Sequence, residues 1–197
     1  MQNKYKNMKN IITYFLLLIS SNSMSAVNLI NGSLDALKNE HKIAISLDCS
    51  KCVYRTNNKN LPLEYFLAMS QRSEDWEVRS LNYFVENFNE ETLKEGLIAV
   101  VSNNLQECQY ELIILPKYVF RDGSIEALIH IIDHNNNSTI AKLAFKADGD
   151  EDDKITFRDP LRDAGEEVGK LFGKVLRGKK IKIKNQRSRN NLDDIYY

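Results

Sequence analysis

Residues 110–149 contain three consecutive segments with the residue pattern of β-strands. Residues 110–120 are rich in β-branched and aromatic side chains, whereas residues 124–133 and 139–147 alternate between apolar and polar side chains. Turn residues separate them, at 121–123 and again at 134–138. An alternating strand buries one face and exposes the other, so a sheet of this kind needs a covering layer on one side. We expect the rest of the chain to supply that layer.

Amphipathic segments that could form the covering layer lie on both sides of the three strands. Helical periodicity is present in residues 61–70, 76–94 and 160–176, and two further short strands are predicted at 42–48 and 97–101. Gly96 is expected to end the second helix, and Asp159 to cap the third. The pattern predicts a single α+β domain over residues 42–178. Its sheet is mainly antiparallel with about five strands, and two to three helices pack on one face.

The first 26 residues are predicted to be a secretory signal peptide rather than part of the domain. Lys4, Lys6 and Lys9 precede an apolar run at 11–19, and small residues follow at 20–26. A membrane-spanning helix needs about 20 apolar residues, so this run is too short to favour a retained anchor. Cleavage is expected near Ser25 or Ala26, and a periplasmic or secreted location follows.

The formal net charge of zero hides an uneven distribution along the chain. The signal peptide carries +3 and residues 177–197 carry +5, which leaves −8 for the body. An acidic body argues against nucleic acid as a partner. Residues 27–41 are Asn-rich and are predicted to be a flexible lead or to contain a short helix. Residues 179–197 are predicted to be a disordered basic tail, the one segment expected to touch a membrane.

Three cysteines follow the signal peptide, namely Cys49, Cys52 and Cys108. Export makes one disulfide the expected state, either Cys49 with Cys52 or one of these with Cys108; the sequence does not choose between them. A redox Cys-x-x-Cys site needs a helix directly behind it to lower the thiol pKa. Residues 53–58 are a poor helix former, so a structural disulfide or free thiols are favoured over a redox enzyme.

Glycines recur every four residues on the last predicted helix, at Gly165, Gly169 and Gly173. Each glycine costs a helix roughly 1 kcal/mol relative to alanine, so the stripe needs a reason. One interpretation is close helix packing inside the domain. The other is a docking groove for a second subunit or another protein.

The acidic segment after the third strand partly matches a calcium-binding loop. Asp148, Asp150 and Asp152 have the 1,3,5 spacing, and Asp159 lies at position 12, but position 6 is Asp153 instead of glycine. Calcium is therefore a weak alternative to a solvated turn, and no other cofactor is indicated. His130, Asp133 and His134 superficially match a zinc-protease pattern, but that pattern requires a helix and this segment is predicted to be a strand.

The stretch from Lys42 to Leu176 resembles a group of exported bacterial envelope proteins. The likeness rests on Leu47-Asp48, on Phe88-Asn89, on the Tyr110–Ile113 strand, on a strand ending in Asp133 and on the closing helix with Gly165, Gly169 and Gly173. These features look like the curli-export lipoprotein and the N-terminal domain of TolB, and the chain is also similar to uncharacterised exported proteins of the Bacteroidetes. The resemblance implies an assembly or accessory role and carries over no catalytic residue. The lipoprotein cysteine of the group is absent here.

The combined observations predict a non-enzymatic, exported accessory or assembly module of the cell envelope. It would act by contact with another envelope protein or with itself, through the glycine stripe or an exposed sheet edge. The alternatives are a secreted metal-dependent hydrolase, which would gather His130, His134 or the acids of residues 148–153, and a carrier of small ligands or lipids, which would hold an apolar cavity between helices and sheet.

Overall fold

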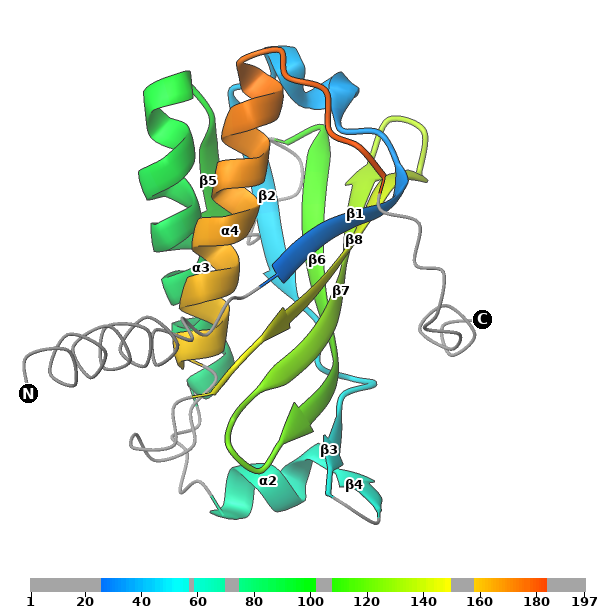
Figure 1. Cartoon of the computed structure of the whole chain (residues 1–197), viewed down its shortest axis with the longest axis vertical. Helices are drawn as coiled ribbons and strands as arrows, with labels where there is room; N and C mark the ends of the chain where they lie inside the picture. The colour runs from blue at the N-terminus through cyan, green and yellow to red at the C-terminus, as the bar shows by residue number, and fades with distance from the viewer. Residues whose placement is uncertain (1–25, 57–58, 70–74, 102–107, 150–157, 184–197) are drawn as a thin grey trace, which may run out of the picture.

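The computed structural model describes residues 26–56, 59–69, 75–101, 108–149 and 158–183 (Figure 1). The strands are β1 (Ala26–Gly32), β2 (Lys42–Leu47), β3 (Val53–Arg55), β4 (Asn60–Pro62), β5 (Ile98–Val101), β6 (Tyr110–Phe120), β7 (Ile125–Asp133) and β8 (Ser138–Ala147). The helices are α2 (Leu63–Met69), α3 (Trp76–Thr92) and α4 (Arg158–Leu176), with short 3-10 turns η1 (Asp35–Asn39) and η2 (Leu93–Glu95). The α+β class is confirmed.

All described strands belong to one sheet with the order β1-β8-β7-β6-β2-β5, and β3 joins β6 and β4 beside this path. β2 runs parallel to β5 and β6, and β3 runs parallel to β6, while the other pairs are antiparallel. The sheet therefore has eight strands instead of about five, and it is mixed. The extra strands are short or Asn-rich segments, in which few alternating positions are available to signal a strand.

The three long strands form as their alternation predicts. Ile114 lies opposite Ile129, and Ile129 lies opposite Leu143, so the apolar positions of β6, β7 and β8 share one face. Because side chains alternate strictly along a strand, this register sends all of them to the same side.

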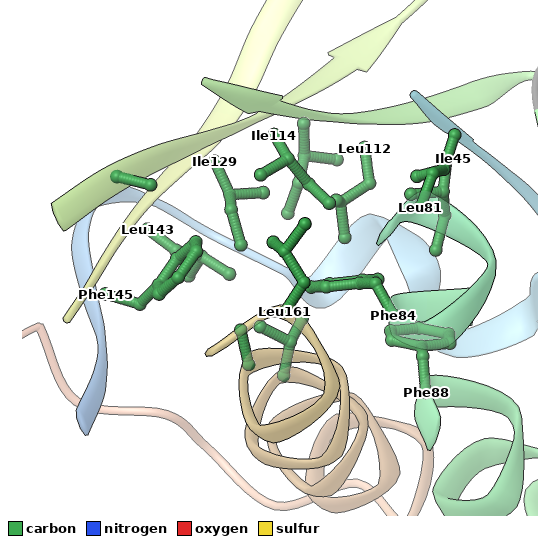
Figure 2. Packing of buried hydrophobic residues seen from close by; sticks show 14 of the residues in the cluster. Ile45, Leu81, Phe84, Phe88, Leu112, Ile114, Ile129, Leu143, Phe145 and Leu161 are labelled. Carbon is green, nitrogen blue, oxygen red and sulfur yellow. The ribbon is translucent and has the colours of Figure 1, made fainter. Parts of the chain in front are cut away.

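Helices α3 and α4 lie side by side on that face and enclose the core (Figure 1). Phe84 and Phe88 of α3 and Leu161 of α4 point toward the strand residues Leu112, Ile114 and Leu143 (Figure 2). Phe88 also contacts the ring of Phe172 edge-on, with ring centroids 5.1 Å apart. Aromatic side chains thus fill the space between helices and sheet. The alternative function as a carrier of small ligands or lipids would require an apolar cavity in this same space.

The prediction of a flexible lead at residues 27–41 is wrong. β1 pairs with β8 along the edge of the sheet, with Val27 opposite Phe145. Leu34 and Leu37, around η1, are both buried. Val27 and Leu29 alternate toward the core, and only the intervening asparagines suggested flexibility. The domain therefore begins at β1 and not at residue 42.

The predicted boundary signals of the helices are confirmed at Gly96 but not at Asp159. Gly96 adopts a left-handed conformation with φ 85° and ends the α3–η2 segment, as expected. α4 begins at Arg158, so Asp159 lies inside the first turn, 3.2 Å from Arg162, instead of capping the helix. Residues 1–25 of the predicted signal peptide and residues 184–197 of the predicted tail lie outside the described residues. None of the helices in the described part of the chain has the length and apolar content that a membrane crossing requires.

A proline interrupts the central strand β6. Pro116 has no backbone N–H to donate, and the register between β6 and β7 shifts between Pro116 and Tyr118. On the other side of β6, β2 ends at Leu47, opposite Ile114, and β3 begins at Val53, opposite Tyr118. The chain therefore leaves the sheet between β2 and β3 at the level of Pro116.

Candidate functional site

The sheet face that points away from α3 and α4, here called the outer face, is the broadest candidate for an interaction surface. Its centre carries half-buried aliphatic side chains, and at its β5 edge Ile98 is 46% exposed. The half-buried aliphatic residues are Ile113, Leu115 and Ile132 on the central strands, and Val100 on the edge strand β5. Lys42, Lys142, Lys146 and Glu126 lie on the same face by strand alternation. The surface therefore combines an apolar centre with charged groups, the composition of many protein interfaces.

A buried carboxylate organises one end of the outer face. Glu111 is 6% exposed and accepts a hydrogen bond from the Ser46 hydroxyl, with Oγ and Oε1 2.6 Å apart. Its other oxygen lies 3.1 Å from Nε2 of His134, just beyond β7. The acid stands between the serine and the histidine, whereas nucleophilic catalysis places the histidine between serine and acid. The three side chains tie β2, β6 and the end of β7 together.

The two histidines of the zinc-protease-like pattern do not come together. His130 lies on β7 and lines a hollow of about 390 Å³ with Asn31 and Lys142. His134 follows four residues later, which corresponds to roughly 13 Å along an extended chain. Asp133 accepts hydrogen bonds from the Asn135 N–H and the Asn136 amide at 3.0 and 2.8 Å, so it shapes the turn. No group of three metal-ligating side chains occurs in the described residues.

A side chain of α3 hydrogen-bonds the outward-facing backbone groups of Ala99 on the edge strand β5. The Asn89 amide donates to the Ala99 carbonyl at 3.0 Å and accepts from the Ala99 N–H at 2.7 Å. These two backbone groups are the kind that a further strand would need for pairing. The predicted use of an exposed sheet edge is therefore blocked at Ala99.

The glycine stripe faces α3, so it does not form an open docking groove. A Cβ atom on Gly165 would lie 2.3 Å from the Phe84 carbonyl oxygen, and one on Gly169 would lie 2.9 Å from the Phe88 carbonyl oxygen. At Gly173 the nearest atom would be 3.4 Å away, an ordinary contact. The glycines let the backbones of α3 and α4 approach, so the interpretation as packing within the domain is correct and the docking groove is wrong.

The calcium prediction falls largely on residues that are not described. Asp150 and Asp152 lie outside the described residues. Asp148 follows β8, and Asp159 lies in α4, where it pairs with Arg162. The two described members therefore give no calcium-binding arrangement of their own.

The Cys49-x-x-Cys52 segment forms a tight turn directly after β2. The Cys52 N–H donates to the Cys49 carbonyl at 2.9 Å, and the turn borders a pocket of about 480 Å³ that Leu63, Leu67 and Trp76 also line. Burial raises the pKa of the Cys52 thiol to about 12. It also raises the pKa of Cys49, and the neighbouring Cys52, Glu77 and Asp48 add to this rise. All three cysteines are thiols in this structure.

Asn89 and Glu111 hold the most informative polar contacts, and the sequence did not single out either as a site. Glu111 could have been noticed, because it is one charge in an otherwise apolar run from Tyr110 to Leu115. Asn89 entered the sequence analysis only as part of the Phe88-Asn89 likeness, because its role at the sheet edge becomes visible only when β5 is placed beside α3.

Comparison with known proteins gives distant structural likenesses only. No family model matches the sequence, and no curated protein matches it. One similar solved structure is the dodecamer of a PelC variant from Paraburkholderia phytofirmans, with 12% identity, coverage of 78% of this chain and 99% of that chain, and a TM-score of 0.41. Another is protein XCC0632 from Xanthomonas campestris, described as DUF330, with 14% identity, coverage of 70% and 85%, and a TM-score of 0.39. Function therefore has to be inferred from the residues of this chain.

Proposed function

We propose that this protein is a non-catalytic, exported module of the cell envelope that binds another exported protein through the outer face of its sheet. The observation that carries the proposal is the two-sided apolar character of the central strands. α3 and α4 cover one side, and the other side presents Val100, Ile113, Leu115 and Ile132. A sheet that faces water on one side normally shows polar residues there. Aliphatic residues at the centre of that side favour a protein contact.

Charged groups of both signs surround the apolar centre of the outer face. Lys42 and Lys142 belong to the outer face, and Lys146 lies 3.9 Å from Glu126. Charges at the rim of an interface select the partner and its orientation more than they add affinity. We therefore propose an exported partner protein whose charges complement this rim.

Site-specific photocrosslinking in the cells that export the protein tests this proposal. A photoreactive residue is placed at Ile113, at the centre of the outer face, and separately at Val78, which is exposed on α3. We expect an adduct from position 113 and none from position 78. The mass of the adduct distinguishes a partner protein from a second copy of this chain.

A pair of aspartate substitutions completes the design. Ile113→Asp should abolish the adduct formed by a photoreactive residue at Leu115, while Val78→Asp should leave it intact. Circular dichroism and thermal unfolding must show that both variants remain folded. An adduct that persists in Ile113→Asp, or equal adducts from positions 113 and 78, would refute the outer face as the contact surface.

A further inference from the structure

The turn between β2 and β3 lies where the sheet lacks ladder hydrogen bonds. β2 and β3 both run parallel to β6, and the segment between them faces the level of Pro116. The Asp48 N–H donates to the Ile114 carbonyl at 2.9 Å, and pairing resumes only at Val53. Pro116 cannot donate a backbone hydrogen bond. Backbone pairing with β6 is therefore interrupted between the end of β2 and the start of β3.

The turn hydrogen bond implies that the Cα atoms of the two cysteines lie within the range that a disulfide spans. The hydrogen bond from the Cys52 N–H to the Cys49 carbonyl closes a four-residue turn, and the Asp48 carboxylate accepts the Ser50 N–H at 2.9 Å. The first and fourth Cα atoms of such a turn lie within about 7 Å of each other. Disulfides span Cα separations of about 4.4–6.8 Å, so a Cys49–Cys52 bond needs little backbone movement.

Cys108 lies at the other end of β6. Tyr110 and Pro116 are separated by roughly 20 Å along the strand. The Gln109 carbonyl accepts the His134 N–H at 2.9 Å, so the chain continues away from Pro116 toward Cys108. Cys108 is also buried. A bond from Cys108 to either other cysteine of the same chain would need a large rearrangement, which corrects the prediction that left this pairing open.

We propose that Cys49 and Cys52 form a disulfide in the exported protein and that Cys108 remains a buried thiol. Two S–H bonds break and one S–S bond forms. The two electrons and two protons pass to a disulfide-containing oxidant of the envelope, whose own disulfide is reduced to two thiols. The new bond ties the end of β2 to the start of β3 across the Pro116 gap, and it holds β3, β4 and α2 against β6.

The bond is structural and not catalytic. Burial raises the pKa of both thiols, and Glu77 and Asp48 further disfavour the Cys49 thiolate. A thiol with a high pKa is a poor leaving group, so the disulfide exchanges slowly with external thiols. Redox enzymes show the opposite arrangement, with a lowered thiol pKa.

Peptide mapping tests the pairing directly, because trypsin cleaves after Lys51, between the two cysteines. The protein is expressed with its own N-terminal segment, so that it is exported, and is then purified. It is unfolded in the presence of iodoacetamide, which labels every free thiol, and digested with trypsin without reduction. We expect peptides 43–51 and 52–55 to appear joined, with the mass of their sum less two hydrogen atoms. The label should fall on Cys108 alone. A label on Cys49 and Cys52, or any disulfide at Cys108, would overturn the proposal.

Two variants and one exchange measurement complete the test. Cys108→Ala should leave the joined peptides unchanged, whereas Cys49→Ser should remove them and place the label on Cys52. Reduction should raise amide hydrogen exchange in β3 and α2 and leave α3 and α4 unchanged. Equal exchange before and after reduction would show that the bond does not tie these elements to β6.

Discussion

The two faces of the sheet are held in different ways. On the core face, Phe84, Phe88 and Phe172 fill the space under two helices whose backbones touch at Gly165 and Gly169. On the outer face, the buried carboxylate of Glu111 is held by Ser46 and His134. The core face is held by close packing of side chains and helix backbones. The outer face is held by a few polar contacts between strands.

This difference indicates where the molecule tolerates change. A close-packed core responds to the addition of a single methyl group, because neighbouring backbone atoms cannot move independently. The outer face lacks a covering helix among the described elements and presents half-buried aliphatic side chains, so its substitutions should affect binding more than folding. The photocrosslinking variants above test the outer face, and three further predictions test how the core side, the sheet edge and the Cys49–Cys52 turn are held.

The largest effect is expected at the helix–helix contact. Gly165→Ala would place a methyl group 2.3 Å from the Phe84 carbonyl oxygen, so α3 and α4 must separate. The expected loss is about 3 kcal/mol in the free energy of unfolding, despite the gain of about 1 kcal/mol in helix propensity. Urea denaturation of the folded variant measures this difference.

Gly173→Ala is the matched control on the same stripe. Its added methyl group would meet its nearest neighbour at 3.4 Å, so we expect no loss and a gain of up to about 1 kcal/mol from helix propensity. Equal destabilisation by both substitutions would contradict the view that the stripe serves close packing near Gly165.

An intermediate effect is expected at Asn89, which joins the helical layer to the sheet edge. Asn89→Ala removes both hydrogen bonds to Ala99 and leaves two buried backbone groups without them, at a cost of about 2 kcal/mol. The opened edge should also favour concentration-dependent association, measurable by sedimentation velocity. Asn87→Ala, which loses one bond to the Tyr83 carbonyl, should cost less and leave the association state unchanged. Similar behaviour of the two variants would exclude edge protection as the role of Asn89.

The smallest effect is a pH dependence of the reduced protein at the Cys49–Cys52 turn. The pKa of Cys52 is raised from 9.0 to about 12 in the folded state, so the unfolded thiol loses its proton first as the pH rises. Stability is therefore complete below about pH 8 and falls as the pH passes 9, by about 0.5 kcal/mol per thiol near pH 9. Urea midpoints of reduced and oxidised protein should diverge over this range. Parallel curves would contradict burial of the two thiols.

Much of the fold could be read from local patterns. The alternation in residues 110–147 predicted β6, β7 and β8, and helical spacing with Gly96 and Pro160 as boundary signals predicted α3 and α4. β1 was missed because its asparagines outweighed Val27 and Leu29. The parallel pairing of β2 and β3 with β6 was missed because it joins segments that are distant in sequence.

The sequence by itself determined the α+β class, the amphipathic helices and the apolar face of the long strands, because these depend on periodicity within one segment. Only the tertiary structure decided that the glycine stripe serves α3, that Asn89 closes the β5 edge and that Cys108 lies far from Cys49 and Cys52. Each of these depends on which segments become neighbours. Which segments become neighbours depends on the strand register and the packing of the whole domain, and it cannot be read from the residues of any single segment.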